Sequence, residues 1–555
     1  MEMNCKVTIG NRWLKIGSNW WVTNPCLAKN EPPATEHELI ELLRHNINTS
    51  SILIIDNCVL LYAGQFYSDN IFYCKSNNQL SVSDDLRRLI SQDYKLDVGA
   101  IANYVFAKGF YFNQTPFQGV FKVSQGCLCK FTCDSANERY LGYLKPTGVP
   151  CTPKRFLSMM EEKLQFVNKK QVLSPLSGGL DSSFVASFIK RHFDCSLQGF
   201  HIYCSQAAHR ELEQARFLCK KLQIPLIEID FTWQRFNETF LHFSKLSPLP
   251  FPNSGYRYYL SYRYGNTNVH PDYIVSGDAS DGLFELSPDF YLFDKISAFD
   301  RWMPLKLYEK LDHILDNARP AFRLAESLRW RINKYLDFRL RLYHWKGTRV
   351  DYHGSWRIPF FSTGKYPTFL DLINRRGMYD VDNRLFLLNT FWSYLELPIF
   401  IPLIRQLFGA GYFTPFLDQD IAGLALNLSS RQARSKHFLK QVASSYLPSE
   451  IIARKKMGFI TPFQFWIPGP MRSIAIELLL GRNGLVDRGI VDEDALIALV
   501  LDFFNGSAQF GCWEIMSLVA LEVWLRVNFD KRFSRTEIEK ISLAEFVSSQ
   551  QSSWF

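Results

Sequence analysis

The chain has 555 residues and a net charge of +9, with 47% hydrophobic and 21% charged residues. This length exceeds what one hydrophobic core covers, and the composition excludes a disordered chain, so two or three globular domains are expected. The modest charge without a polybasic tail argues against nucleic-acid binding, whereas a positive field would help to bind ATP or an acidic peptide. Twelve scattered cysteines and the lack of a signal-peptide pattern predict a cytoplasmic protein with free thiols.

Residues 1–145 have a β-rich pattern. Short apolar runs separated by polar turns predict a meander of strands: SSILIIDN, CVLLYAG, NIFYCK and QLSVSD. A helix is predicted near 98–108, followed by a strand pair around Gly126. Cys127 and Cys129 share one face of a strand, and without a C-x-x-C pair or a histidine partner they predict no metal site.

Strands and helices alternate from about residue 151, after a linker marked by Pro146, Gly148 and Pro150. The predicted helices cover 154–168, 181–192, 209–222 and a segment from about 232, and the predicted strands cover 171–176, 198–204, 226–230 and 272–276. This alternation predicts an α/β fold, a doubly wound parallel sheet with helices on both faces, and a mostly helical part follows after residue 300. We therefore expect two domains, residues 1–148 and residues 151–555.

The most apolar stretch of the chain, residues 385–404, contains Glu396 and Pro398 and is followed by Arg405. Charged and helix-breaking residues at these places favour a buried helix-and-turn region over a membrane span. We therefore predict that the chain has no membrane span.

The segment LSPLSGGLDSS (173–183) joins a buried strand to the start of a helix. Glycines let the backbone approach a ligand closely, and free N–H groups at a helix N-terminus attract anions. Asp181 can hold a cation against phosphate oxygens. No lysine follows the glycines as in a kinase-type P-loop. The segment instead resembles the SGGxDS loop of ATP pyrophosphatases, which implies ATP contacts by Ser177, Gly178, Gly179, Asp181, Ser182 and Ser183.

A second loop, SGDASDGLF (276–284), follows the strand predicted at 272–276. It carries Asp278 and Asp281 between glycines. Asp181 and Asp281 both follow the carboxyl ends of strands in one expected sheet, so they could converge. Two carboxylates suit Mg²⁺, because this ion prefers few carboxylates together with phosphate oxygens.

Several segments resemble the asparagine-synthetase superfamily, which also contains β-lactam synthetases and lasso-peptide cyclases. SGDASDGLF is similar to the SGEGSDELF loop of asparagine synthetases, and TPFLDQD (414–420) is similar to their PFLDH segment. The block at 434–463 is similar to their GKYILRE…LLPEEILNRKKMGF block, and residues 512–527 resemble their closing helix. The resemblance covers about 151–530 and implies an ATP-pyrophosphatase (PP-loop) synthetase domain there.

VSDDLRRLI (82–90) is similar to the ASE-LKAL segment of the family's Ntn-type glutaminase domain. Glutaminases of this class need a cysteine directly after Met1, whereas this chain begins Met-Glu-Met-Asn-Cys, and Cys5 cannot become N-terminal by simple removal of Met1. The RG and NGEIYN stretches that bind glutamine are also absent. We therefore expect a degenerate glutamine-amidotransferase-like domain that supplies no ammonia from glutamine.

Matched positions imply further roles. Lys436 would contact phosphate, and Lys456 in RKKMGF would stabilise the intermediate and the leaving phosphate; the alternative for both lysines is a solvated surface. Asp278 stands where the family carries a residue assigned to deprotonating the nucleophile, which a carboxylate can do if its pKa is raised. Glu396 is the candidate partner for this step; the alternative is a glutamate that solvates a helix end. The positions implied to surround the nucleotide are Leu176, Phe200, His201, Ile202 and Gly277.

The resemblance implies that a substrate carboxylate is adenylated with ATP and Mg²⁺ and that an amine then forms an amide. We favour closure of a macrolactam in a precursor peptide, as in lasso-peptide cyclases, because the segment from residue 320 is rich in arginine and aromatic residues. A leader peptidase and a leader-recognition protein would then be partners. The alternatives are ring closure on a small amino acid, as in β-lactam synthetases, a ligase that uses free ammonia, and a non-catalytic scaffold.

Overall fold

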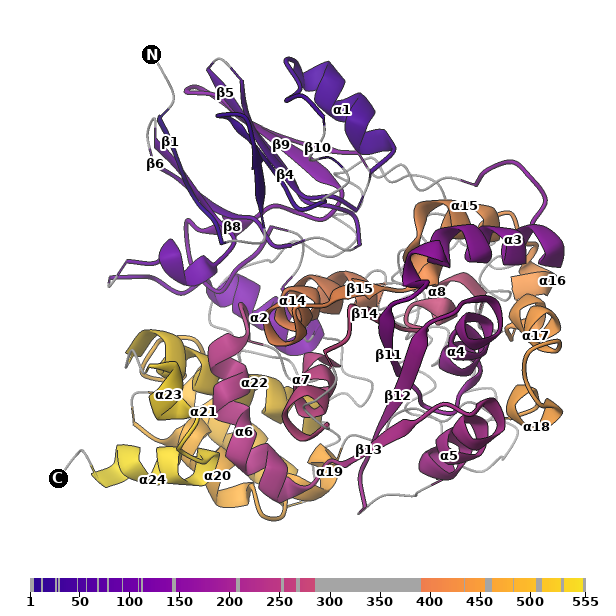
Figure 1. Ribbon diagram of the computed structural model, residues 1–555. Helices are drawn as coiled ribbons and strands as arrows, with labels where there is room; N and C mark the ends of the chain where they lie inside the picture. The colour runs from indigo at the N-terminus through magenta and orange to yellow at the C-terminus, as the bar shows by residue number, and fades with distance from the viewer. Residues whose placement is uncertain are drawn as a thin grey trace, which may run out of the picture.

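The computed structural model describes residues 4–284 and 391–552, apart from short stretches of which 455–461 and 506–511 are the longest. Figure 1 shows two β-sheets in the N-terminal part, a parallel sheet flanked by helices, and a helical region formed mainly by the C-terminal part. The described residues form three sheets, which have four, six and five strands.

The two N-terminal sheets lie face to face. The four-stranded sheet has the order β1-β7-β6-β8, with strands Asn4–Thr8, Gln79–Ser83, Phe72–Ser76 and Phe121–Lys122. The six-stranded sheet has the order β10-β9-β5-β4-β3-β2, with strands Ala136–Tyr140, Cys127–Phe131, Cys58–Tyr62, Ser51–Ile55, Trp20–Val22 and Leu14–Ile16. All neighbouring strands are antiparallel except β1 and β7, which are parallel.

Both faces of the six-stranded sheet are buried, and strand β5 shows why. Side chains alternate along a strand, so Val59 and Leu61 belong to the core between the sheets, while Leu60 and Tyr62 belong to the core on the opposite face. That second core is covered by α1 (Glu36–Arg44), which contributes Leu39 among other residues. The layers are therefore α1, the six-stranded sheet and the four-stranded sheet.

The outer face of the four-stranded sheet packs on helix α2 (Val98–Ala107), and this core continues into the rest of the molecule. Tyr104 of α2 is fully buried and donates from its hydroxyl to the carbonyl of Ser517, 3.2 Å away in α22 (Cys512–Leu525). Asp69, also fully buried, forms an ion pair with Arg405 of α14. The division into two domains between residues 148 and 151 stays a prediction. Residues 146–150, at this predicted boundary, are exposed.

The five-stranded sheet is entirely parallel, with the order β13-β12-β11-β14-β15. Its strands are Leu226–Asp230, Ser196–Tyr203, Gln171–Pro175, Tyr273–Val275 and Gly411–Phe413. In Figure 1, α4 and α5 lie on one side of it and α7 and α14 on the other. The helices that accompany it are α3 (Pro153–Leu164), α4 (Leu180–His192), α5 (Arg210–Leu222), α7 (Ser254–Tyr264), α8 (Ser280–Phe284) and α14 (Phe391–Phe408).

This strand order creates a topological switch point. From β11 the chain passes through α4 to β12 on one side, whereas β14 lies on the other side of β11. In doubly wound sheets the carboxyl ends of the strands at such a point form the ligand crevice. The loops that begin at residues 176 and 276 leave the sheet at this place.

The long, buried helix α22 packs on α2, α6, α19 and α20. Helices α15, α16 and α17 lie elsewhere, against α3, α4 and α8 beside the parallel sheet. The bounds of these and the remaining helices are α6 Trp233–Leu246, α15 Gln419–Ala425, α16 Ser430–Ala433, α17 His437–Ala443, α18 Ser449–Ile452, α19 Phe463–Trp466, α20 Arg472–Leu480, α21 Glu493–Phe504, α22 Cys512–Leu525, α23 Arg535–Ile538 and α24 Leu543–Ser552. Instead of the expected helix and turn, α14 continues through Pro398 and Pro402. None of the described helices is both long and apolar enough to cross a membrane.

Candidate functional site

The loop after β11 adopts the close turn that its glycines predict. Gly178 has a positive φ of 68°, and a Cβ atom there would lie 2.7 Å from the Cβ atom of Gln214 and 2.8 Å from the amide nitrogen of Ala215. Ser177 accepts from the amide of Gly179 at 3.2 Å, and its own amide donates to the Ser182 hydroxyl, also at 3.2 Å. The loop is therefore pressed against α5 and held by its own serines.

The second loop touches the first at Gly277. A Cβ atom at this position would lie 2.6 Å from the amide nitrogen of Ser182 and 2.7 Å from the carbonyl carbon of Asp181. Only glycine allows this approach without a shift of one loop. The hydroxyl of Ser280 then donates to Asp181 Oδ1 at 2.7 Å, so the convergence expected from the sequence is present.

Asp181 and Asp281 meet at the ammonium group of Lys436. Lys436 Nζ lies 2.5 Å from Asp181 Oδ2 and 2.5 Å from Asp281 Oδ1. Burial works to lower the pKa of Lys436, but the two carboxylates outweigh it and raise the pKa above its usual value. Burial raises the pKa of Asp181. The positive charge of Lys436 opposes this rise, and the negative charge of Asp281 adds to it.

The backbone around this cluster is strained. Among the described residues, five other than glycine have a positive φ, and three of these are Ala279 (68°), Ser435 (51°) and Lys436 (57°). Such conformations cost free energy and collect at sites where function requires them. The amide of Lys436 also donates to the carbonyl of Phe284 at 2.9 Å, which ties the start of α17 to α8.

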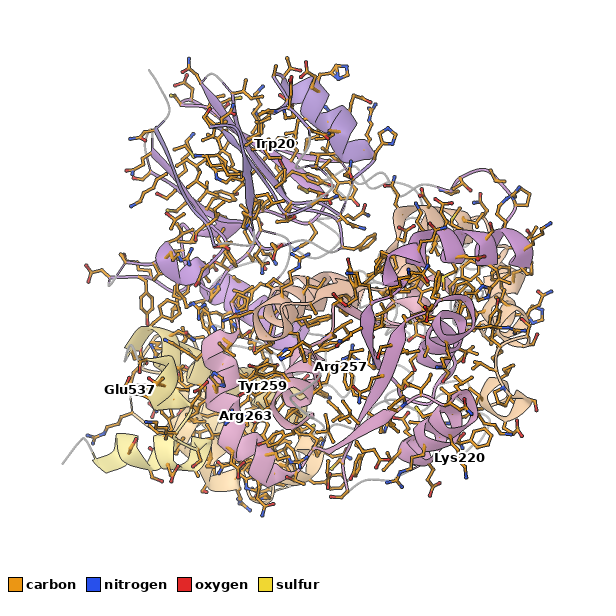
Figure 2. All side chains as sticks on the ribbon, viewed as in Figure 1. Trp20, Lys220, Arg257, Tyr259, Arg263 and Glu537 are labelled. Carbon is orange, nitrogen blue, oxygen red and sulfur yellow. The ribbon has the colours of Figure 1, made fainter. Side chains whose placement is uncertain are left out.

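Asp278 is surrounded by donors. Its Oδ2 atom accepts from Arg257 Nη2 at 2.6 Å, from the hydroxyl of Tyr412 at 2.6 Å and from that of Tyr258 at 3.1 Å. The hydroxyl of Thr414 donates to its carbonyl at 2.7 Å. Figure 2 shows Arg257 between α7 and the strands of the parallel sheet.

These contacts set the charge of Asp278. Burial works to raise its pKa, but the charge of Arg257 and the hydrogen bonds from Tyr412 and Arg257 outweigh this, so the pKa lies below its usual value. A general base at this position was expected to have a raised pKa. The direction is opposite, so at neutral pH the carboxylate is ionised and accepts hydrogen bonds from three donors.

Arg454 holds the first loop from the other side. Its Nη1 atom donates to the carbonyl of Gly178 at 3.1 Å, and its Nη2 atom lies 4.0 Å from Glu211 Oε1. Burial raises the pKa of Glu211 to about 7, and Arg454 opposes this shift. The contacts that Arg454, Arg257 and Tyr412 make here were not predicted from the sequence.

The other expected residues lie as follows. Leu176 and Ile202 are core residues of the sheet, and contact with adenine stays a prediction for them. His201 is buried, and its Nδ1 atom lies 2.6 Å from the carbonyl of Leu176. Ser183 is fully buried, so a phosphate contact by its hydroxyl stays a prediction too. Lys456 lies outside the described residues, as does the side chain of Glu396, although its backbone belongs to α14.

The donor set is compatible with Mg²⁺. Among the described residues, no group of three or more His, Cys, Asp or Glu side chains could hold a metal. Asp181 and Asp281 nevertheless converge on the ammonium group of Lys436. The two negative charges of the carboxylates exceed the single positive charge of this group. Two carboxylates that need further oxygen ligands fit an ion that binds together with phosphate.

The parallel sheet, its switch point and the loop at 177–183 define a synthetase-type α/β protein with an ATP-pyrophosphatase loop. The chain belongs to the asparagine synthase family, which matches residues 163–526.

Known proteins resemble parts of the chain. The glutamine-hydrolysing asparagine synthetase 1 of Bacillus subtilis (strain 168) is 21% identical over 383 residues, which cover 65% of this chain and 57% of that protein. The tRNA-specific 2-thiouridylase MnmA of Buchnera aphidicola subsp. Schizaphis graminum is 30% identical over 125 residues, which cover 20% of this chain and 33% of that protein. The chain thus spans little more than half the length of the first relative and a third of the second.

Among solved structures, the NH3-dependent NAD synthetase from Campylobacter jejuni is similar, with 18% identity over 33% of this chain and 93% of that chain and a TM-score of 0.19. The U34-tRNA thiolase NcsA from Methanococcus maripaludis has 12% identity over 46% of this chain and 80% of that chain, with a TM-score of 0.17.

Proposed function

We propose that this protein is an ATP-dependent ligase that adenylates a carboxylate and then converts it into an amide. The observation that carries this proposal is the convergence of Asp181, Asp281 and Lys436 beside the SGGLDSS loop. Catalysis of adenylation requires that phosphate charge be neutralised and the triphosphate be positioned, and these groups suit both tasks. Membership of the asparagine synthase family supports the amide-forming reaction class.

In the proposed reaction the substrate carboxylate attacks the α-phosphate of ATP, and pyrophosphate leaves. An amine then attacks the acyl carbon of the adenylate, and AMP leaves. The loop at 177–183 would hold the pyrophosphate, and Lys436 would offer its ammonium group to phosphate oxygens. Asp181 and Asp281 would hold Mg²⁺, which when bound neutralises part of the phosphate charge.

The position of Cys5 supports an amine that does not come from glutamine. Cys5 lies within β1 and pairs with Leu80 of β7 in a parallel ladder. Burial raises the pKa of its thiol to about 11. The thiolate is the nucleophilic form of cysteine, so this residue is poorly suited to attack glutamine at neutral pH.

We further propose that the amide closes a ring in a precursor peptide, between its N-terminal amine and an Asp or Glu side chain, as in lasso peptides. Both reacting groups then arrive on one molecule, which lowers the entropic cost of the encounter. The region 320–395 is rich in arginine and aromatic residues, and this composition supports a peptide substrate. Residues 320–390 of it lie outside the described residues. A leader peptidase and a leader-recognition protein are part of this proposal as partners.

The test is ATP–pyrophosphate exchange with acidic core peptides, taken from short reading frames beside the gene. We expect exchange that depends on the peptide carboxylate, and a product that has lost one water. Asp181→Ala should abolish the exchange, whereas Asp194→Ala, which removes an exposed carboxylate just after α4, should not. Exchange with no carboxylate at all would overturn the adenylation proposal.

The product distinguishes the alternatives within the family. Cyclisation of a small β-amino acid in place of the peptide would favour a β-lactam-synthetase-like reaction. Formation of a primary amide with ammonium salts would favour a ligase that uses free ammonia.

A further inference from the structure

The ammonium group of Lys436 lies between Asp181 and Asp281, the two candidate metal ligands. Its Nζ atom lies 2.5 Å from one oxygen of Asp181 and 2.5 Å from one oxygen of Asp281. The side chain of Lys436 is 8% exposed, whereas that of Asp281 is 48% exposed. The ammonium group therefore lies on the protein side of the cluster, and Asp281 lies on the solvent side.

The surrounding structure fixes Lys436 in this place. Its backbone amide is bound to the carbonyl of Phe284, which ends the short helix that carries Asp281. The hydroxyl of Ser280, from the same helix, holds the other oxygen of Asp181 at 2.7 Å. The lysine and both carboxylates are thus parts of one unit, which distinguishes Lys436 from a solvated surface lysine.

This arrangement has an electrostatic consequence for a divalent cation. A free metal ion that binds both carboxylates must displace the ammonium group, which would then lose its ion pairs with Asp181 and Asp281 in a mostly buried place. A triphosphate changes this balance, because its oxygens offer the displaced ammonium group a new partner.

We propose that Lys436 is an internal counter-cation that excludes free divalent metal from Asp181 and Asp281 and admits the metal together with a triphosphate. The proposal rests on the ATP-dependent function above for the identity of the nucleotide. It assigns to Lys436 a role in the order of binding, in addition to the expected contact with phosphate.

The test is the binding of Mn²⁺, which takes the same oxygen ligands as Mg²⁺ and loses its sharp electron paramagnetic resonance spectrum on binding. Without nucleotide, Lys436→Met should bind Mn²⁺ about tenfold or more tightly than the unaltered protein, because a repulsive charge has gone from between two carboxylates. Lys440→Met removes the same charge one turn further along α17 and should leave Mn²⁺ affinity unchanged. Lys436→Arg keeps the charge and should keep the exclusion of free Mn²⁺.

The addition of ATP completes the test. In the unaltered protein ATP should tighten Mn²⁺ binding strongly, and by linkage Mn²⁺ should tighten ATP binding by the same factor. In Lys436→Met this coupling factor should fall. Unchanged or weaker binding of free Mn²⁺ by Lys436→Met, in protein whose thermal unfolding is unaltered, would overturn the inference. Absence of ATP binding by the unaltered protein would overturn the proposed function instead, and the measurement without nucleotide would still decide the role of Lys436.

Discussion

Replacement of Gly178 by alanine should disable the first loop for two separable reasons. The φ of 68° at Gly178 is unfavourable for any residue with a Cβ atom, at about 1 to 2 kcal/mol. The added Cβ atom would also lie 2.7 Å from the Cβ of Gln214 and 2.8 Å from the amide nitrogen of Ala215. The amide nitrogen of Ala215 belongs to the backbone of α5 and cannot swing aside as a side chain can. The loop or the helix must therefore move, at a further cost of about 1 to 3 kcal/mol.

The chain supplies a control that carries the first cost without the second. Gly489 has a φ of 67°, and a Cβ atom there would meet nothing within 4 Å. Gly489→Ala should therefore lose about 1 to 2 kcal/mol of stability, and Gly178→Ala about 2 to 5 kcal/mol. Gly179→Ala has an ordinary φ and approaches only the Ser177 hydroxyl, at 3.1 Å, so a small loss is expected.

Thermal unfolding and equilibrium binding of ATP should be measured for the three variants. A displaced loop moves its backbone N–H groups and hydroxyls away from the phosphates, so Gly178→Ala should lose ATP affinity far beyond what its loss of stability explains. Gly489→Ala should bind ATP normally. Equal losses of ATP affinity in both variants, or normal affinity in Gly178→Ala, would refute the close contact with α5 as the reason for glycine.

Three further predictions concern charged residues that are buried or partly buried. Arg405→Met leaves the carboxylate of Asp69 buried without this partner and should cost about 3 to 5 kcal/mol in urea unfolding. Glu211 has a pKa raised from 4.5 to about 7, so its contribution to stability is full below pH 4.5 and is lost as the pH rises through 7; Glu211→Gln should flatten this part of the thermal-unfolding profile. Asp278 has a lowered pKa, so the deficit of Asp278→Asn, about 1.5 to 3 kcal/mol, should be constant above about pH 5 and shrink only as acid protonates the native carboxylate.

Each of these has a result that contradicts it. Addition of Asp69→Asn to Arg405→Met should restore part of the lost stability, and an additive further loss would argue against the ion pair. An unaltered pH profile in Glu211→Gln would mean that a group other than Glu211 causes the loss of stability in this pH range. A deficit of Asp278→Asn that grows on acidification would mean that Asp278 is protonated in the native protein.

Much of the α/β part could be predicted from local pattern. The strand expected at 226–230 coincides with β13, and the helix expected at 181–192 differs from α4 by one residue. The elements that were missed are short or lack a clear period. Strand β15 has three residues, and α7 (SGYRYYLSYRY) places tyrosines on several faces, so neither stands out in a single sequence.

In the candidate site, too, some residues could be predicted from local sequence and others could not. Asp181 and Asp281 could be predicted because each follows a glycine-containing loop at a strand end, where composition alone signals a turn. The partners of Asp278 could not, since Arg257 comes from α7 and Tyr412 from β15, which is 134 residues away in the chain. These contacts depend on the pairing of β15 with β14 and on the packing of α7 against α14, β12 and β13. They also reverse the expected direction of the pKa shift of Asp278.

The ionised state of Asp278 bears on how an amine would be deprotonated. A peptide α-amine has a pKa near 8, so a useful fraction is already neutral at slightly alkaline pH and needs no strong base. What the second step of amide formation then requires is a fixed set of charges around the acyl carbon. In the proposed reaction Asp278 would meet that need by holding Arg257 and Tyr412 in place, three residues before Asp281. We therefore expect loss of Asp278 to act through the placement of these donors, with a reduced rate at every pH, whereas loss of a general base would shift the pH profile.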